Sequence, residues 1–163
     1  MAYHLNAQTT RNHNVSNGAQ NPVTEKSINI LQGKRIFYVE DDARNRSVVQ
    51  IILQHAGATV EFERWGFSET AVPKINAFRP DLILLDLMFP ANVSGYDVFD
   101  ALRRVPSLQK IPVVAVSASD PEIEIPKAKA KGLNGFIGKP ISIENFATYL
   151  ATVLDGHTVW EPQ

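Results

Sequence analysis

Several polar residues that can do chemistry follow directly on short apolar runs of the sequence. They are Glu40, Asp41 and Asp42 after the first run, then Asp86, Ser117 and Lys139 after later ones. Carboxylates held side by side repel one another, and a divalent cation relieves that repulsion. Mg²⁺ favours one or two carboxylates, which Asp41 and Asp86 could supply, together with water and phosphate oxygens. With a lysine and a hydroxyl nearby, the set suits phosphoryl transfer, in which an aspartate can be the nucleophile.

These residues need a scaffold that brings their runs together, and the pattern of the chain predicts one. Apolar runs indicate strands at residues 36–39, 59–62, 82–85, 113–116 and 135–137. Helical spacing of apolar residues follows, at residues 47–56, 69–78, 96–104 and 143–154, with a short helix within 121–131. Strands and helices in alternation predict an α/β domain with a parallel sheet and right-handed crossovers. Function gathers at the C-terminal ends of such strands, where these polar residues stand.

The predicted domain covers residues 33–155 and leaves a segment at each end. Residues 1–32 are rich in Asn and Gln, carry few charges and show no helical or strand period. We expect a disordered polar leader, because such a composition cannot offset the entropy lost on ordering. A partner-binding tail is the alternative. Residues 156–163 are expected to form a short C-terminal tail, too short for an output domain.

Composition excludes several classes of protein. Apolar residues make up 44% and charged residues 20% of the chain, as in ordinary globular proteins. The 16 basic and 17 acidic side chains give a net charge of -1, so nothing favours nucleic acid or an anionic membrane as partner. The absence of cysteine excludes disulfides, thiolate metal sites and a cysteine nucleophile. With no signal peptide or long apolar run, a cytoplasmic location is predicted.

The order of these features resembles a known family, the receiver domain of two-component response regulators. The resemblance rests on Val39-Glu40-Asp41-Asp42, Asp86 after Leu82-Ile83-Leu84-Leu85, Ser117-Ala118 and Lys139-Pro140, in that order. It covers about residues 34–155. The resemblance implies a flavodoxin-like, doubly wound sheet of five parallel strands in the order 2-1-3-4-5, with five helices.

The resemblance also implies roles for individual residues. Asp86 would be the phospho-acceptor, and Glu40 and Asp41 the acidic pair. Mg²⁺ would be bound by Asp41, Asp86 and the backbone carbonyl of Met88, with Glu40 acting mainly through water. Lys139 would contact the phosphoryl oxygens.

Three further roles follow from the same resemblance. The Ser117 hydroxyl would hydrogen-bond the phosphoryl group, and Phe136 would occupy an aromatic switch position. Pro140 would follow a cis peptide bond. Simpler interpretations stay open: Ser117 can be an ordinary hydroxyl at a strand end, and Phe136 a core aromatic. Asp42 is expected to start a helix as its N-cap rather than to bind metal.

The sequence departs from the family pattern at two places. Members usually carry a Pro four residues after the acceptor and a Gly four residues after that, whereas Gly95 lies five residues after Pro90. The loop beside Asp86 is therefore one residue longer. Pro126 lies inside the fourth predicted helix, which we expect to be short or broken near Ile125. The usual output surface is thereby placed in doubt.

The sequence therefore predicts a signalling receiver and not an enzyme acting on other substrates. A histidine kinase or histidine phosphotransfer protein would phosphorylate Asp86 in a Mg²⁺-dependent reaction, and a downstream protein would read the change. A homodimer is left open. The first alternative is a phosphate-independent interaction module on a receiver scaffold. The second is a haloacid-dehalogenase-type phosphatase, which fits poorly because it needs an aspartate where Met88 stands.

Overall fold

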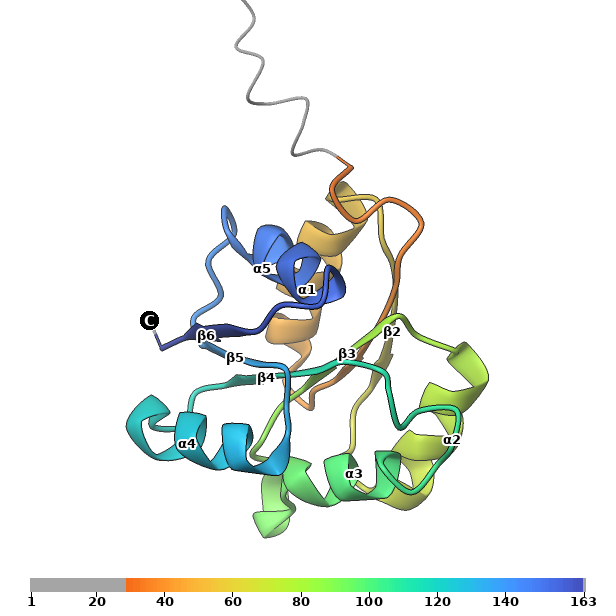
Figure 1. Ribbon diagram of the computed structural model, residues 1–163, viewed down its shortest axis with the longest axis vertical. Helices are drawn as coiled ribbons and strands as arrows, with labels where there is room; N and C mark the ends of the chain where they lie inside the picture. The colour runs from red at the N-terminus through yellow and green to blue at the C-terminus, as the bar shows by residue number, and fades with distance from the viewer. Residues whose placement is uncertain (1–28, 163) are drawn as a thin grey trace, which may run out of the picture.

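A six-stranded parallel sheet forms the centre of the computed structural model, which describes residues 29–162 (Figure 1). The strand order is β2-β1-β3-β4-β5-β6. The strands are β1 (Arg35–Val39), β2 (Thr59–Glu63), β3 (Leu82–Leu85), β4 (Val113–Ser117), β5 (Gly135–Gly138) and β6 (Val159–Glu161). The parallel α/β domain expected from the alternating pattern, and the flavodoxin-like topology implied by the resemblance, are confirmed, with one strand more than predicted.

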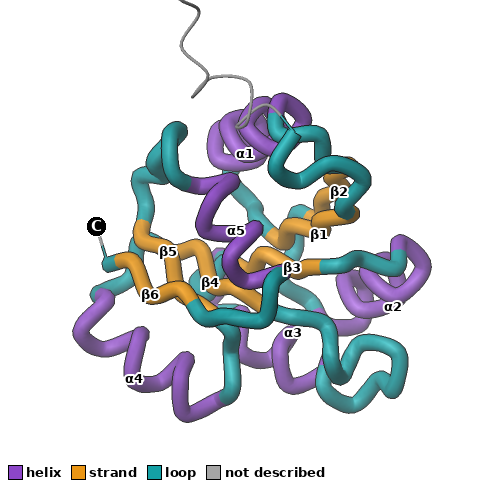
Figure 2. The backbone as a smooth tube through the Cα atoms, turned by 45° about the horizontal axis from the view of Figure 1, so that its top comes forward, coloured by secondary structure: helices purple, strands orange, loops and turns teal. Residues whose placement is uncertain are grey.

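Five α-helices cover the two faces of the sheet. They are α1 (Ala43–His55), α2 (Ser68–Phe78), α3 (Gly95–Leu102), α4 (Pro121–Lys131) and α5 (Phe146–Leu154). Helices α1 and α5 lie on one face, and α2, α3 and α4 lie on the other (Figures 1 and 2). Because both faces are covered, β3 and β4 are buried along their whole length, which explains their unbroken apolar sequences.

The sixth strand lies within residues 156–163, which the sequence predicted to be a tail. Helix α5 ends at Leu154, and Gly156, with φ 90°, reverses the chain. Strand β6 then runs parallel to β5, with Val159 opposite Gly135 and Trp160 opposite Phe136. A Cβ atom at Gly135 would stand 2.7 Å from the Val159 carbonyl oxygen, so the glycine permits this close pairing. A three-residue strand gives too short a pattern to be read from sequence.

The N-terminal boundary also differs from the prediction. The expected disordered leader covered residues 1–32, of which residues 1–28 lie outside the described part of the chain. Residues 29–32 belong to the folded domain: Leu31 is fully buried, and its amide donates to the Ala56 carbonyl at 2.9 Å. A buried leucine and a backbone hydrogen bond therefore attach these residues to the end of α1.

Helix α4 contradicts the expectation of a break near Ile125. It runs without interruption from Pro121 to Lys131, with Pro126 inside. The proline removes one intrahelical hydrogen bond, but both helix ends are capped. The Asp120 side chain accepts from the Glu122 amide at 2.9 Å, and Gly132 adopts a left-handed conformation at the C-terminus.

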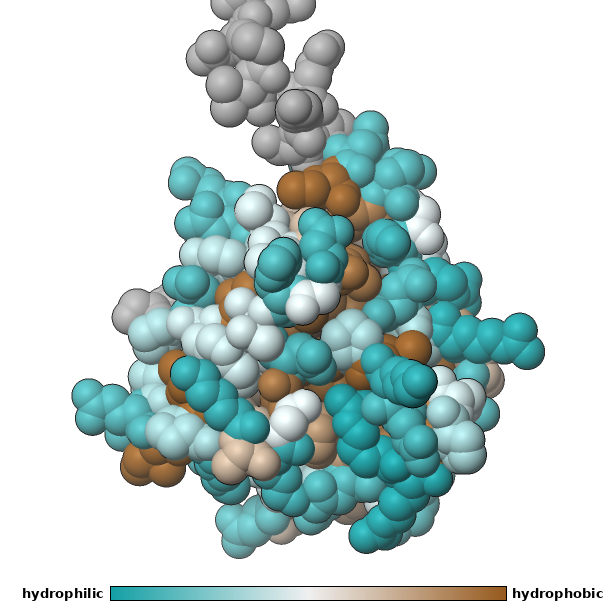
Figure 3. Space-filling model, in the orientation of Figure 1, coloured by the Kyte–Doolittle hydropathy of each residue, from teal (hydrophilic) through white to brown (hydrophobic). Residues whose placement is uncertain are grey.

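Helix α5 begins at Phe146, three residues later than predicted. The residues before it form turns, and Ile143, expected in the helix, is exposed. No helix within residues 29–162 is both long and apolar enough to cross a lipid bilayer. The face of the molecule in Figure 3 is mainly hydrophilic, with apolar residues in small separate groups.

Candidate functional site

The predicted site residues meet at one edge of the sheet, at the C-terminal ends of four strands. Val39, the last residue of β1, pairs with Leu85, the last residue of β3, so Glu40 and Asp86 follow on neighbouring strands. On the other side, Ser117 at the end of β4 pairs with Gly138, the residue before Lys139. Parallel pairing thus brings together groups that are up to 99 positions apart.

Three carboxylates and one ammonium group form the centre of this site. One carboxylate oxygen from each of Glu40, Asp41 and Asp86 lies within 4.8 Å of the other two. The Lys139 Nζ donates to Glu40 Oε2 and to Asp86 Oδ2, both at 2.6 Å. The lysine therefore bridges two of the acidic groups and offsets part of their repulsion.

Because the charged side chains of Asp86 and Lys139 are largely buried, the pKa of each depends strongly on its charged neighbours. The Asp86 side chain is 8% exposed and that of Lys139 is 11% exposed. Burial raises the pKa of Asp86 more than the neighbouring Lys139 lowers it, so the pKa lies above its ordinary value. For Lys139, burial lowers the pKa, but Asp86 and Glu40 together raise it above its ordinary value. The lysine is therefore a permanent cation at neutral pH.

The backbone of the acidic pair is held by Arg46 on the first turns of α1. Its NH1 donates to the carbonyl oxygens of Glu40 and Asp41, each at 2.7 Å. This arginine was not singled out from the sequence, since its spacing from the pair is typical of any exposed helix residue.

Asp42 lies apart from the carboxylate cluster and has the role expected of it. Its side chain caps α1 by accepting from the Arg44 amide at 2.7 Å, which confirms the N-cap prediction. Hydrogen bonds from the Arg44 side chain and amide lower the pKa of Asp42 to about 2.

The Ser117 hydroxyl is buried close to this centre but is engaged locally. Its Oγ lies 3.0 Å from Ser119 Oγ and accepts from the Ser119 amide at 3.3 Å. Within residues 29–162, these contacts connect Ser117 to the β4–α4 loop rather than to Asp86.

Phe136 and Met88, the other two predicted site residues, differ in their exposure. Phe136 on β5 is fully buried in the core between the sheet and α2, α3 and α4. The Met88 side chain is 64% exposed, whereas its amide donates to Asp86 Oδ1 at 3.2 Å. The peptide bond between Lys139 and Pro140 is cis, as the resemblance implied.

The extra residue before Gly95 is accommodated in a tight loop beside Asp86. Residues Pro90–Asn92 form one 3-10 turn, in which Ala91 and Asn92 have φ of 60° and 59°. The Phe89 amide donates to the Val93 carbonyl at 3.1 Å and closes the loop. A Cβ atom at Gly95 would lie 2.0 Å from the Asp86 carbonyl oxygen. The inserted residue is therefore accommodated in the exposed residues 90–92, and the backbone at Gly95 stays in close contact with the Asp86 carbonyl.

Tyr38 reaches the site although the sequence analysis treated it as part of an apolar strand. Its hydroxyl donates to Glu40 Oε2. Burial and the nearby carboxylates raise the pKa of Tyr38 well above its ordinary value, so the hydroxyl keeps its proton. A signal was present, because residues two apart on a strand share a face and Tyr38 stands two before Glu40.

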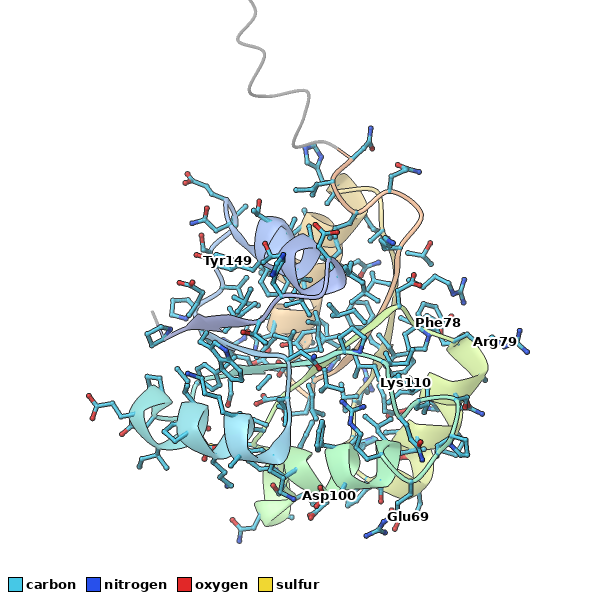
Figure 4. The ribbon with its side chains drawn as sticks, in the orientation of Figure 1. Glu69, Phe78, Arg79, Asp100, Lys110 and Tyr149 are labelled. Carbon is cyan, nitrogen blue, oxygen red and sulfur yellow. The ribbon has the colours of Figure 1, made fainter. Side chains whose placement is uncertain are left out.

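Two cavities among residues 29–162 lie at opposite edges of the sheet. One of about 250 Å³ borders the cluster and is lined by Met88, Ser94, Tyr96 and neighbouring residues. The other, of about 520 Å³, is lined by Asn76, Arg79, Ser107 and neighbouring residues. These residues precede β3 and β4, so the cavity lies at the opposite edge of the sheet; Arg79 at the end of α2 is labelled in Figure 4. The carboxylates and Lys139 thus gather at the C-terminal edge of the sheet, whereas this larger cavity lies at the other.

Comparisons with known proteins agree with this arrangement. The family model described as the response regulator receiver domain matches residues 36–151. The chain is 34% identical over 122 residues to the phosphate regulon transcriptional regulatory protein PhoB of Klebsiella pneumoniae, covering 74% of this chain. It spans about half (52%) of the length of PhoB. It is 31% identical over 121 residues to the polar-differentiation response regulator DivK of Brucella anthropi, covering 74% of this chain and 96% of DivK.

Solved structures show the same fold. The chemotaxis protein CheY4 of Vibrio cholerae superposes with a TM-score of 0.67 at 26% identity, covering 74% of this chain and 98% of CheY4. The receiver domain of a signal transduction histidine kinase from Syntrophus aciditrophicus gives a TM-score of 0.65 at 30% identity, with coverage of 76% and 92%.

Proposed function

The chain belongs to the response regulator receiver domain family, and we propose that Asp86 is the residue on which it accepts a phosphoryl group. One observation carries this proposal. Asp86 belongs to the three-carboxylate cluster at the sheet edge, meets the Lys139 ammonium at 2.6 Å and is more exposed than Glu40. Glu40 also meets the lysine, but it is 1% exposed and accepts from Tyr38 as well.

Receiver domains bind Mg²⁺ at an acidic pocket, and the residues of this chain fit such an ion. Three carboxylate oxygens within 4.8 Å of one another form the all-oxygen donor set that Mg²⁺ prefers. We propose that Asp41, Asp86 and the Met88 carbonyl bind the ion directly and that Glu40 acts through water. When bound, the ion would offset negative charge on the phosphoryl oxygens.

The proposed donor is a phosphohistidine of a histidine kinase or a histidine phosphotransfer protein. An Asp86 carboxylate oxygen attacks phosphorus, the phosphorus–nitrogen bond breaks, and its electron pair returns to the imidazole. The Lys139 ammonium, beside Asp86, stabilises the charge that develops on the phosphoryl oxygens. It is already oriented by two hydrogen bonds, so little reorganisation is needed.

The phosphorylated state is then proposed to change a surface that a downstream protein reads. Ser117 would exchange its hydrogen bond with Ser119 for one to the phosphoryl group, which the proximity of Ser117 to Lys139 supports. Phe136 would follow as the switch aromatic, although its full burial also suits a core residue. The downstream target, a homodimer and a cytoplasmic location stay predictions.

Intact mass spectrometry tests the proposal directly. The full chain is incubated with Mg²⁺ and acetyl phosphate, with Asp86→Asn and Asp155→Asn as variants. Asp155 is an exposed aspartate after α5 and serves as the matched control. We expect one added phosphoryl group in the wild type and in Asp155→Asn, none in Asp86→Asn, and none after removal of Mg²⁺ with a chelator.

Two outcomes would contradict this function. An equal mass gain in Asp86→Asn would place the acceptor elsewhere. The absence of any gain in the wild type, with acetyl phosphate and with a phosphorylated histidine kinase, would favour the phosphate-independent interaction module.

A further inference from the structure

Tyr38 combines a buried ring with a hydroxyl that reaches the acidic site. The residue lies on β1, is fully buried and packs in the core beneath α1 and α5. Its hydroxyl donates to Glu40 Oε2, the same oxygen that accepts from Lys139 at 2.6 Å. The ring is therefore part of the core, whereas the hydroxyl is part of the site.

Glu40 accepts three hydrogen bonds, one more than Asp86, whose two oxygens accept from the Met88 amide and from Lys139. Oε1 of Glu40 accepts from the Asp42 amide at 3.1 Å, while Oε2 accepts from Tyr38 and Lys139. By contrast, the Asp41 carboxylate is half-buried and has no hydrogen-bond or ion-pair partner within residues 29–162. Asp41 is thus available to bind an ion directly, and Glu40 is held in place by three donors.

From this difference we infer that Tyr38 is a positioning residue, which fixes Glu40 beside Lys139 and thereby shapes the Mg²⁺ site. The inference rests on the proposed function of that site. A buried carboxylate held by three donors keeps one orientation. Without the hydroxyl, Glu40 keeps only the Asp42 amide and Lys139 as donors, and its carboxylate is held less firmly beside the lysine and ion-bound water. Groups that orient the direct ligands of a metal typically change metal affinity by about 10- to 100-fold. Tyr38 acts one step further out, through Glu40, so the lower end of this range is expected.

Tyr38→Phe tests the inference because it removes only the hydroxyl and keeps the ring in the core. Mg²⁺ binding to the full chain is measured by isothermal titration calorimetry without any phosphoryl donor. We expect the dissociation constant for Mg²⁺ to rise about tenfold. Thermal unfolding of the Mg²⁺-free proteins checks that the variant is folded before binding is compared.

Tyr96→Phe is the matched control. The Tyr96 hydroxyl also donates to a glutamate, Glu124 Oε2, at 2.6 Å, but this pair connects α3 to α4. Its removal should leave the dissociation constant for Mg²⁺ unchanged within about twofold.

A second background separates positioning from general support of the fold. If Tyr38 acts through Glu40, adding Tyr38→Phe to Glu40→Gln should change Mg²⁺ affinity by less than about twofold, because the effects of coupled residues do not add. Unchanged binding in Tyr38→Phe, or a full tenfold loss in the Glu40→Gln background, would overturn the inference. Failure of Asp86 to accept a phosphoryl group would leave this titration interpretable, since no donor is used.

Discussion

Two regions of this molecule contain the same three kinds of side chain in contact, with different consequences. At the sheet edge, Tyr38 donates to Glu40, which also accepts from Lys139. Between α3 and α4, Tyr96 donates to Glu124. There Lys127 lies 3.7 Å from Glu124, and its Nζ stands 4.2 Å from the centre of the Tyr96 ring.

Burial and neighbouring charge separate the two groups. Lys139 and Glu40 are 11% and 1% exposed, whereas Lys127 and Glu124 are 52% and 16% exposed. The first group also faces Asp86 and Asp41, and therefore has more negative than positive charge. The second is close to neutral, and its lysine is exposed to water, which weakens the ion pair. The same kinds of side chain thus connect α3 to α4 in the second region, whereas at the sheet edge they form a site with excess negative charge that favours binding of a cation.

Lys139→Met should give the largest effect, because it leaves the buried carboxylates without their cation. Removing one member of a buried ion pair costs about 3–5 kcal/mol of unfolding free energy. The loss is measured by urea denaturation without Mg²⁺. Added Mg²⁺ should restore part of the stability, because ligands that bind only the folded state stabilise it. A loss below about 1 kcal/mol would show that the two regions differ less than their burial indicates.

Asp86→Asn should have a smaller effect of the opposite sign. Because the pKa of Asp86 is raised in the folded state, its stabilising contribution is complete below the ordinary Asp pKa and is lost as pH rises through the raised value. The asparagine variant should therefore be more stable than wild type at neutral pH in Mg²⁺-free buffer. The difference should shrink in acid. Denaturant midpoints across pH, with Asp155→Asn as control, measure it; a less stable variant at pH 7 would contradict the raised pKa.

Tyr96→Phe should lower the unfolding free energy by about 1–2 kcal/mol, as expected when a mostly buried charged acceptor loses a donor. Urea denaturation measures the loss. The effect should be independent of Mg²⁺, in contrast to that of Lys139→Met. Dependence on Mg²⁺ would mean that the α3–α4 contact is linked to the acidic site.

Lys127→Met should have the smallest effect, below about 1 kcal/mol, because water screens the exposed pair with Glu124. It is the direct counterpart of Lys139→Met in the second region. Raising the salt concentration should reduce the effect further. A change as large as that of Lys139→Met would remove the distinction between the two regions.

The sequence predicted the positions of Glu40, Asp86 and Lys139 at the strand ends better than it predicted the ends of the domain. Glu40, Asp86 and Lys139 each follow an apolar run, and parallel pairing places the ends of such runs side by side. The proximity of these residues can therefore be inferred from the strand pattern without knowledge of side-chain packing. Leu31 and strand β6 could not be found in this way, because their structure depends on contacts with distant residues and not on a local period.

Two other misses have a common cause, which is that tertiary contacts override local preference. Pro126 disfavours a helix locally, yet capped ends and burial of Ala128 keep α4 intact. Tyr38 was interpreted as one more apolar strand residue, and its spacing of two from Glu40 was too weak a signal to predict the hydrogen bond that the fold creates.

Strand β6 also determines which backbone groups at the edge of the sheet are available for hydrogen bonding with other chains. Without it, the amide and carbonyl groups along one side of β5 would form an open edge, available for pairing with another polypeptide. The three residues Val159–Glu161 occupy that edge and replace it with a shorter one that ends in an exposed glutamate. A short, charged edge strand is a common protection against edge-to-edge aggregation. Strand β6 therefore leaves the sheet with a shorter edge on this side for pairing with another polypeptide.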